Sequence, residues 1–367
     1  KKSCQKNSKI FFDHMKKIII IILAVTLLIF GVRFARERRA TKSPVTQKND
    51  NTTSTTNSNT TTSTSTTNSN TTTSKYTLVA GDYNFSLIYG GLERAFIVHA
   101  PGLYDGTAPT ALIINFHGGG GNAENQIGTA LMNEKSDEAG FIVVYPNGIS
   151  EPGKPDNRTF NAGNCCGAAR DTSVDDIGFV KKMLIELKSK FNIDTKRIYA
   201  TGYSNGAMLS HRLACEMTDT IAAIASIAGG VQIPECNPSR PIAVLEFHGT
   251  DDRSVKYEGG TCGISATGQS YSCKPVEDVM LSWAKRNSCN ITPKITYDKG
   301  DTTCKTYSSC SNGVEVTLCA IEGGGHTWPG GAYYPDKLLF RKVVGKLTKD
   351  ISANDMMWDF FKKHPLK

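Results

Sequence analysis

The chain of 367 residues lacks the signatures of several protein classes. It has no G-x-x-x-x-G-K-[ST] phosphate loop and no dinucleotide fingerprint with its acidic residue, so nothing predicts a nucleotide. The gaps between its cysteines are irregular, and no pair has the spacing of a zinc site. Its longest apolar run, residues 18–32, has 15 residues, which is short for a membrane span. The sequence therefore implies neither a metal nor an organic cofactor.

The surplus of positive charge is confined to the N-terminal region. The formal net charge is +8, but residues 1–48 alone hold twelve Lys or Arg against two Asp or Glu. The rest of the chain is therefore slightly acidic. A domain that binds nucleic acid usually presents a basic patch. We therefore expect no nucleic-acid partner.

The N-terminal region has the pattern of an export signal. Met15 is followed by two lysines and then by the apolar run 18–32, which has the length of a signal-peptide core. The arginines at 33–39 would favour a cytoplasmic position for the chain that follows the apolar run. The many cysteines later in the sequence instead favour an oxidising compartment outside the cytoplasm. We give the cysteines more weight. Residues 1–42 are assigned to a signal peptide or signal anchor, which makes 18–32 a candidate membrane tether.

Residues 43–75 are a low-complexity Thr/Ser/Asn segment, in which the unit TSTTNSNTTTS occurs twice in tandem. Such a segment cannot bury apolar surface, so we predict a disordered linker. The linker offers hydroxyls for O-glycosylation. Sequons for N-glycosylation occur in it and beyond it, at Asn51, Asn59, Asn70, Asn84, Asn157 and Asn290.

Cysteines point to an oxidising compartment. Cys4 stands alone, and the other ten of the eleven lie between Cys165 and Cys319. An even set confined to one region is typical of disulfides in an exported protein. Together with the signal and the linker, this predicts a protein that is secreted, or anchored at the membrane and facing outside.

From residue 76 to 367 the composition is that of one globular domain. Near-continuous apolar runs predict strands that are buried on both faces, at 111–116, 141–145, 197–201, 221–227 and 242–247. Helices are predicted between them, at 124–139, 174–191, 205–217 and 275–288. Segments 83–88 and 94–100 are candidates for antiparallel edge strands, and 314–319 for the last strand. This alternation predicts an α/β fold with a doubly wound, mostly parallel sheet and helices on both faces.

Residues 202–206, Gly-Tyr-Ser-Asn-Gly, fit the pattern G-x-S-x-G. The predicted strand before them and the predicted helix after them give the context of a nucleophile elbow. Such a turn lifts the Ser204 hydroxyl clear of the backbone, and the helix N-terminus offers N–H groups to a developing negative charge. A glycine-rich turn with a capping serine is the structural alternative. We take Ser204 as the candidate nucleophile.

A serine nucleophile needs a base, and in this context an acid and then a histidine should follow it along the chain. Four histidines follow Ser204: His211, His248, His326 and His364. Only His326 lies in a glycine-rich loop after the last predicted strand, so it is assigned as general base and then general acid. Asp251 and Asp252 both follow the strand 242–247, and the local sequence does not separate them.

His117 and the glycines at 118–121 follow the strand 111–116. A glycine run lets the backbone approach a substrate and aim its N–H groups at an oxyanion. A phosphate cradle is the alternative, but the phosphate-binding motifs are absent. We therefore expect an oxyanion hole formed by the N–H groups of Gly119 and Asn205.

Five motifs in one order carry a resemblance to a known family: HGGGGNAEN, NAGNCCGAARDTSVDDIGF, GYSNGAM, HGTDD and EGGGHTWPGG. The chain resembles the secreted polyhydroxybutyrate depolymerase/feruloyl esterase family, α/β-hydrolases related to carbohydrate esterase family one. The resemblance runs from about residue 93 to 330. The family's pattern HGTxD implies Asp252 as the catalytic acid, beside Ser204 and His326. It also implies that the cysteines within 161–176 form disulfides rather than act in catalysis.

The resemblance implies an extracellular serine carboxylic ester hydrolase that acts through an acyl-enzyme. Its ester substrate would be polymeric, either a plant cell-wall polysaccharide with feruloyl or acetyl groups or a polyhydroxyalkanoate. The alternatives are a peptidase or lactonase with the same triad, and a tethered adhesion protein without catalysis. Trp328 would either bind a ring of the substrate or pack the His326 loop. The segment 261–273 is an insert relative to the family, and Cys262 and Cys273 could close it into a loop.

Overall fold

The computed structural model describes residues 76, 78–264, 269–334 and 338–367. Backbone contacts divide the chain into two units, Lys1–Ser69 and Asn70–Lys367, and every described residue belongs to the second. The predicted signal segment 1–42 and linker 43–75 lie outside the described residues. No helix in the described part of the chain is long and apolar enough to cross a membrane.

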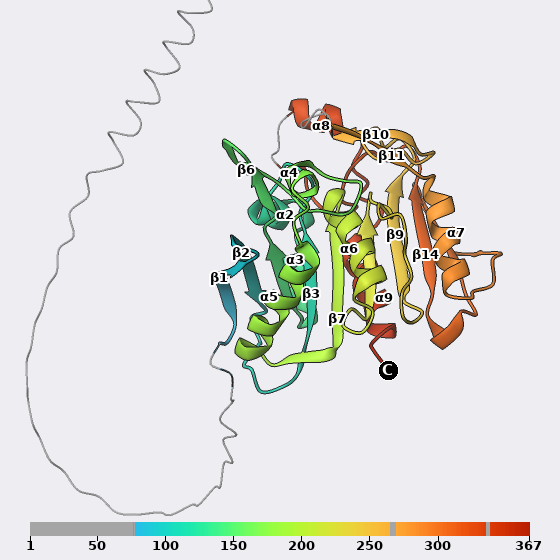
Figure 1. Ribbon diagram of the computed structural model, residues 1–367. Coiled ribbons are helices and arrows are strands. Elements are labelled where there is room, and N and C mark those ends of the chain that lie inside the picture. Colours follow the sequence, from blue (N-terminus) through green and yellow to red (C-terminus); the bar gives the residue numbers. More distant parts are fainter. Residues whose placement is uncertain (1–75, 77, 265–268, 335–337) are drawn as a thin grey trace, which may run out of the picture. The chain divides into compact units, whose positions relative to one another are not determined.

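A ten-stranded sheet runs through the described unit in the order β1-β2-β4-β3-β7-β8-β9-β14-β13-β12 (Figure 1). Its strands are β1 Gly81–Tyr89, β2 Leu92–Ala100, β3 Thr110–Phe116, β4 Ile142–Pro146, β7 Ile193–Tyr203, β8 Ala223–Ile227, β9 Ala243–Gly249, β12 Lys294–Lys299, β13 Thr302–Tyr307 and β14 Val316–Ile321. The strands from β4 to β14 pair in parallel, while those at both edges pair antiparallel. The predicted mostly parallel α/β sheet is confirmed.

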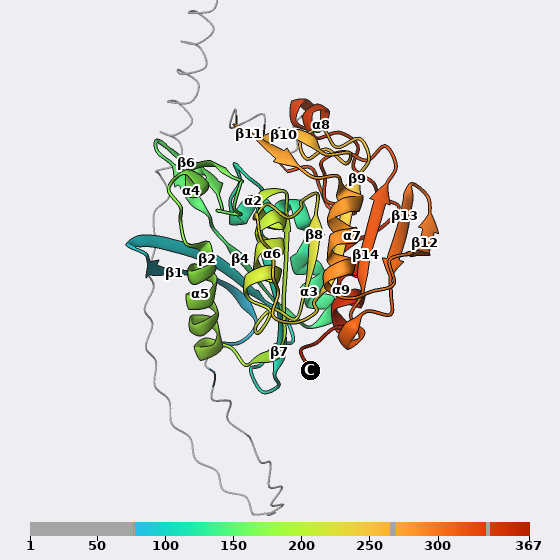
Figure 2. The same cartoon turned by 45° about the vertical axis from the view of Figure 1, so that its right-hand side comes forward.

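Helices cover both faces of this sheet (Figure 2). One face carries α5 Asp176–Lys190, α6 Asn205–Glu216 and α7 Val276–Arg286, and the other carries α2 Ala123–Ala130, α3 Met132–Ala139 and α9 Ala353–Lys363. Alternate side chains of β3 supply the two cores: Ile114 enters the first and Ile113 the second. Burying one such side chain stabilises the fold by about 1.5–3 kcal/mol. Because both faces are covered, the central strands β3, β4 and β8 are almost entirely buried.

The single helix predicted over 124–139 is wrong, because the helix is interrupted at Leu131. Leu131 has φ of 51°, and its N–H closes the end of α2 on the carbonyl of Ile127. Two carbonyls at this end, of Ala130 and Leu131, accept hydrogen bonds from the Asn354 side chain of α9. A partner 223 residues away along the chain therefore stabilises a break that the local sequence does not show.

Several elements lie outside the predicted pattern. The strands β12 and β13 extend the sheet beyond β14, which is therefore not its edge. The insert forms a hairpin of β10 Gly260–Ile264 and β11 Gln269–Cys273. The shorter additions are β5 Ile149–Glu151, β6 Lys154–Thr159, α4 Gly167–Asp171, the 3-10 turn Ser311–Gly313 and α8 Leu338–Val344.

All ten cysteines from Cys165 onward form disulfides, as their even number predicted. The pairs are Cys165–Cys166, Cys215–Cys236, Cys262–Cys273, Cys289–Cys310 and Cys304–Cys319. Cys304 and Cys319 face each other across β13 and β14 and so fasten the strands at that edge. Cys262–Cys273 closes the hairpin of the insert.

Candidate active site

Ser204 occupies a sharp turn between the end of β7 and the start of α6. Its φ of 54° and ψ of −116° are unusual for a residue with a side chain, and such strain persists only where the surroundings enforce it. A Cβ at Gly202 would lie 2.5 Å from the backbone of Gly206, and one at Gly206 would lie 2.3 Å from the Phe116 carbonyl oxygen. Both glycines of the G-x-S-x-G pattern are therefore required by the close approach of β7, α6 and β3.

His326 and Asp252 are joined by a short hydrogen bond. His326 Nδ1 lies 2.6 Å from Asp252 Oδ2, and Oδ1 of the same carboxylate accepts the backbone N–H groups of Ser254 and Val255 at 2.8 and 2.9 Å. Burial alone would raise the pKa of Asp252, but the His326 and His248 rings hold it below its usual value. Asp251, in contrast, is exposed to solvent. The structure thus places Asp252, and not Asp251, against the His326 ring.

The loop after β14 presents His326 to the pocket. Its backbone N–H donates to the Val344 carbonyl at 2.6 Å, and its carbonyl accepts the Tyr203 hydroxyl at 2.5 Å. A Cβ at Gly325 would lie 2.1 Å from the Val344 carbonyl oxygen, so this position requires glycine. Burial raises the pKa of Tyr203 well above its usual value, and Asp252 adds to the effect, so the hydroxyl stays a donor. Tyr203 occupies a variable position of G-x-S-x-G, and the motif gave no signal for its role.

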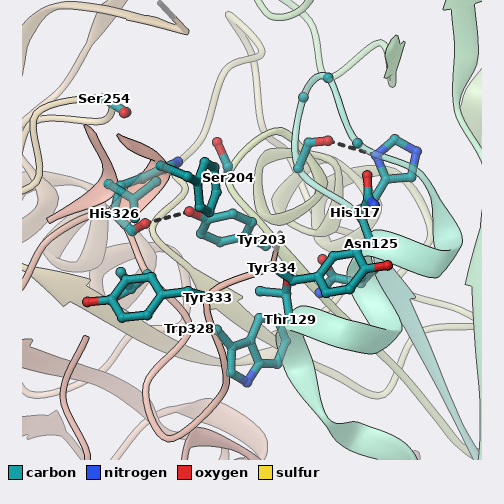
Figure 3. A pocket seen from close by; sticks show the side chains of 18 of the residues that line it. His117, Asn125, Thr129, Tyr203, Ser204, Ser254, His326, Trp328, Tyr333 and Tyr334 are labelled. Atoms are coloured by element: carbon teal, nitrogen blue, oxygen red, sulfur yellow. Dashed lines mark hydrogen bonds between the residues drawn. The ribbon is translucent and has the colours of Figure 1, made fainter. Parts of the chain in front are cut away.

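Ser204, His326 and the glycine-rich loop line one pocket of about 520 Å³ (Figure 3). Ser204 follows β7, the glycine-rich loop follows β3, and Asp252 and His326 follow β9 and β14. These four strands are parallel, so their carboxyl ends lie at the same end of the sheet. Ligands of open α/β sheets bind at this end. The topology therefore brings together residues that are up to 209 positions apart, counting from His117 to His326.

The glycine-rich loop is fixed by His117 and by β6. His117 Nε2 accepts the Gly148 N–H at 3.0 Å, which leaves the ring proton on Nδ1 to donate to the Gly118 carbonyl at 2.7 Å. Burial lowers the pKa of His117 to about 4, so the ring is neutral at pH 7. The Gly120 N–H donates to the Arg158 carbonyl at 2.8 Å.

Two backbone donors near Ser204 remain for a ligand. Within the described residues, neither the Gly119 N–H nor the Asn205 N–H has a hydrogen-bond partner. The Asn205 side chain is buried and holds Phe160 at both its N–H, at 2.8 Å, and its carbonyl, at 3.0 Å. The two donors predicted for an oxyanion are thus not bonded to protein groups; Gly119 lines the same pocket as Ser204, and Asn205 follows Ser204 directly in the chain.

The other wall of the pocket is apolar and comes from the residues after His326. It consists of Trp328, Ala332, Tyr333, Tyr334, Leu339, Phe340, Val343 and Val344. Trp328 is only 1% exposed and donates its Nε1–H to Asn354 at 3.1 Å, so it mainly packs the His326 loop. Tyr333 and α8 were not predicted as part of the site, because a short helix whose apolar side chains are largely exposed shows no clear periodicity. The described residues contain no group of His, Cys, Asp or Glu side chains that could hold a metal ion.

The sequence matches known proteins over this region. The phospholipase/carboxylesterase family matches residues 104–263. Feruloyl esterase B of Piromyces equi is 34% identical over 243 residues, which are 64% of this chain and 42% of that protein. The putative esterase NocK of Nocardia uniformis subsp. tsuyamanensis is 28% identical over 293 residues, 75% of this chain and 80% of that protein. The chain thus spans less than half the length of the first of these relatives.

Among solved structures, the acetyl xylan esterase from Aspergillus awamori aligns with 73% of this chain and 94% of its own, at a TM-score of 0.49 and 14% identity. The fold and the family match define the chain as an α/β-hydrolase. Within that fold, the sequence matches make the chain similar to feruloyl esterases and related esterases. The resemblance drawn from the five motifs is confirmed.

Proposed function

We propose that this chain is a serine carboxylic ester hydrolase with a Ser204, His326 and Asp252 triad. The observation that carries the proposal is the 2.6 Å hydrogen bond between Asp252 and His326, in a pocket that the strained Ser204 also lines. A neutral imidazole whose Nδ1–H is held by a carboxylate presents Nε2 as a base, which is the arrangement that a serine nucleophile requires. Relatives with esterase names support the same class.

The reaction proceeds in two halves. Ser204 Oγ attacks the ester carbonyl carbon while His326 Nε2 takes the hydroxyl proton, and Asp252 stabilises the resulting imidazolium. The carbonyl oxygen becomes an oxyanion against the N–H groups of Gly119 and Asn205, and one such donor typically contributes about 10²–10³ in kcat. The C–O bond to the alcohol then breaks, and His326 returns the proton to the leaving oxygen. Water then gives a proton to His326 and attacks the acyl carbon of the acyl-enzyme. The bond from that carbon to Ser204 Oγ breaks, and His326 returns the proton to Oγ.

The pocket favours an aromatic acyl group over an acetyl group. An acetyl group would leave most of the 520 Å³ empty, whereas a hydroxycinnamoyl group such as feruloyl can contact the aromatic and aliphatic wall. Relatives named feruloyl esterase support this choice, and the alcohol half would then belong to a cell-wall polysaccharide. The five disulfides support a place of action outside the cell. A membrane tether through residues 18–32 remains part of the proposal.

Turnover by wild type and Ser204→Ala tests the proposal. Methyl ferulate, p-nitrophenyl acetate, acetylated xylan and hydroxybutyrate oligomers are compared side by side. We expect methyl ferulate to have the highest kcat/KM and Ser204→Ala to lose a factor of about 10⁴ or more on every ester. The matched control is Ser210→Ala on the same helix, whose hydroxyl only bonds the Gly206 carbonyl. Equal activity of Ser204→Ala and wild type would refute the triad, and a preference for acetyl esters would refute the aromatic acyl group.

A further inference from the structure

A row of buried polar side chains continues from Asp252 into the core, away from the pocket. His248 and Glu246 lie on β9, His211 lies on α6 and Trp283 on α7, and none of the four is more than 1% exposed. His248 Nδ1 lies 3.0 Å from Glu246 Oε1, and His248 Nε2 lies 3.6 Å from Asp252 Oδ2. Glu246 Oε2 lies 3.3 Å from His211 Nε2. Buried charges are costly unless they are paired, so this row has a specific protonation pattern.

The hydrogen bonds fix where the protons are. His211 Nδ1 accepts the Trp283 Nε1–H at 3.1 Å, so the ring proton of His211 is on Nε2 and donates to Glu246. His248 differs, because both of its nitrogens face acceptors: Glu246 Oε1 on one side and the Val255 carbonyl, at 2.7 Å, on the other. A ring between two acceptors carries two protons. His248 is therefore an imidazolium enclosed in protein.

The surrounding groups agree with this assignment. Burial would raise the pKa of Glu246, but its hydrogen bonds to His211 and His248 lower it to about 2, so the carboxylate is charged. Burial would lower the pKa of His248, but Glu246 and Asp252 raise it above its usual value. The other titratable groups nearby are the Tyr257 ring, 6.0 Å from the His248 ring, and Tyr271, whose buried hydroxyl keeps its proton because burial and Asp252 raise its pKa well above its usual value. Neither carries a charge that competes with the cation.

We propose that His248 is a positioning residue for catalysis: a permanently protonated imidazolium, fixed by Glu246, that stabilises the Asp252 carboxylate to which His326 is bonded. This inference rests on the proposed triad. Oδ2 of Asp252 thus has two rings near it, with His326 Nδ1 at 2.6 Å and His248 Nε2 at 3.6 Å. The cation offsets part of the negative charge that His326 experiences. His326 can then give up its proton to the leaving alcohol more readily than beside an uncompensated carboxylate.

Nitrogen NMR of the histidine rings tests the protonation state directly. In the wild-type protein at pH 8, where exposed histidines are neutral, we expect one ring with protons on both nitrogens. That signal should be absent from His248→Gln and present in His211→Gln, in which the amide can still accept from Trp283 and donate to Glu246. If every ring in the wild-type protein is neutral at pH 8, the proposal is wrong, even if His248→Gln does not fold.

The pH dependence of kcat/KM tests the positioning role. Without the cation, Asp252 alone faces His326, which then holds its proton more firmly. For His248→Gln we expect the acid limb of the profile to move up by about one pH unit, and kcat to fall about tenfold with little change in KM. His211→Gln should keep the wild-type limb. If the acid limb of the pH profile is unchanged in a folded His248→Gln variant, His248 has only a structural role and the proposal is wrong. Ser204→Ala separates the two proposals, since its full activity would overturn the triad and leave the NMR result intact.

Discussion

The two walls of the pocket are held in different ways. The wall that carries Ser204, His326 and the glycine-rich loop is fixed by buried hydrogen bonds from Asp252, Tyr203 and His117. The wall formed by Tyr333, Tyr334 and α8 is exposed in large part, with Leu339 76% accessible and Tyr334 43%. The first wall holds reacting groups whose positions must be correct to within about 0.5 Å, whereas the second only has to cover apolar surface. Catalysis and acyl-group selectivity should therefore respond to different substitutions.

The largest effect is expected at the acid of the fixed wall. Asp252→Asn should lower kcat by about 10⁴ on every ester, because an amide cannot hold the His326 tautomer and stabilise its cation. Asp251→Asn is the matched control, since its side chain is exposed. It should stay within about twofold of wild type, as surface substitutions usually do. Steady-state kinetics on p-nitrophenyl acetate measure both. Equal losses in the two variants would contradict the assignment of Asp252.

Gly325→Ala tests the place where the two walls meet. The added methyl group would lie 2.1 Å from the Val344 carbonyl oxygen at the end of α8, so the loop must shift and take His326 with it. We expect a loss of about 10²-fold in kcat/KM and a destabilisation of about 1–3 kcal/mol. Gly323→Ala is the control, because its φ of 64° adds strain but no atom lies within 4 Å of the new Cβ. It should lose stability and keep most of its kcat/KM, as measured by urea unfolding and kinetics.

The fixed wall should also make stability depend on pH through His117. The folded ring has a pKa of about 4, while the unfolded ring titrates near its ordinary value of 6.5. Between these values the unfolded state binds more protons, so stability is present above pH 6.5 and is lost as the pH falls toward 4. The loss is on the order of 3 kcal/mol for a fully buried ring. Between pH 7 and 4, the free energy of unfolding of His117→Gln should fall less steeply than that of the wild-type protein. Equal slopes in the two proteins would contradict a buried neutral His117 ring.

The smallest effect is expected on the exposed wall. Leu339→Ala removes apolar contact with an aromatic acyl group, so kcat/KM for methyl ferulate should fall about fivefold. Turnover of p-nitrophenyl acetate should not change, because the acetyl group does not extend to α8. Leu338→Ala is the control, since Leu338 is 71% exposed and does not line the pocket. A parallel loss on both substrates would show that α8 supports the chemistry and that the two walls are not independent.

The parts of the site that could be predicted from the sequence are those that local patterns specify. Ser204 lies in a strand-turn-helix motif, and His326 follows the last predicted strand. The choice of Asp252 over Asp251 came from the resemblance, because it depends on a turn in which the carboxylate accepts the N–H groups of Ser254 and Val255. Spacing alone does not reveal such a turn.

The missed features depend on partners that are distant in sequence, or on residues without a pattern. The break at Leu131 depends on the side chain of Asn354, and much of the apolar wall comes from half-buried or exposed residues without a clear period. The edge strand β12 is mostly exposed and contains three charged residues, so it shows no buried run. Glu246 did leave a signal, an acidic residue inside an otherwise apolar strand. A buried charge of this kind indicates a partner, which here is His248.

Asn354 joins the end of α2, the start of α9 and Trp328 of the His326 loop through one side-chain amide. It lies late in the chain, long after Ser204 and Asp252 have been synthesised. A chain that ends at His326 contains every proposed reactive side chain but not the residue that fastens this loop. We therefore expect activity to appear only when the last helix has been synthesised and packed, so an incomplete chain is inactive although its triad residues are all present.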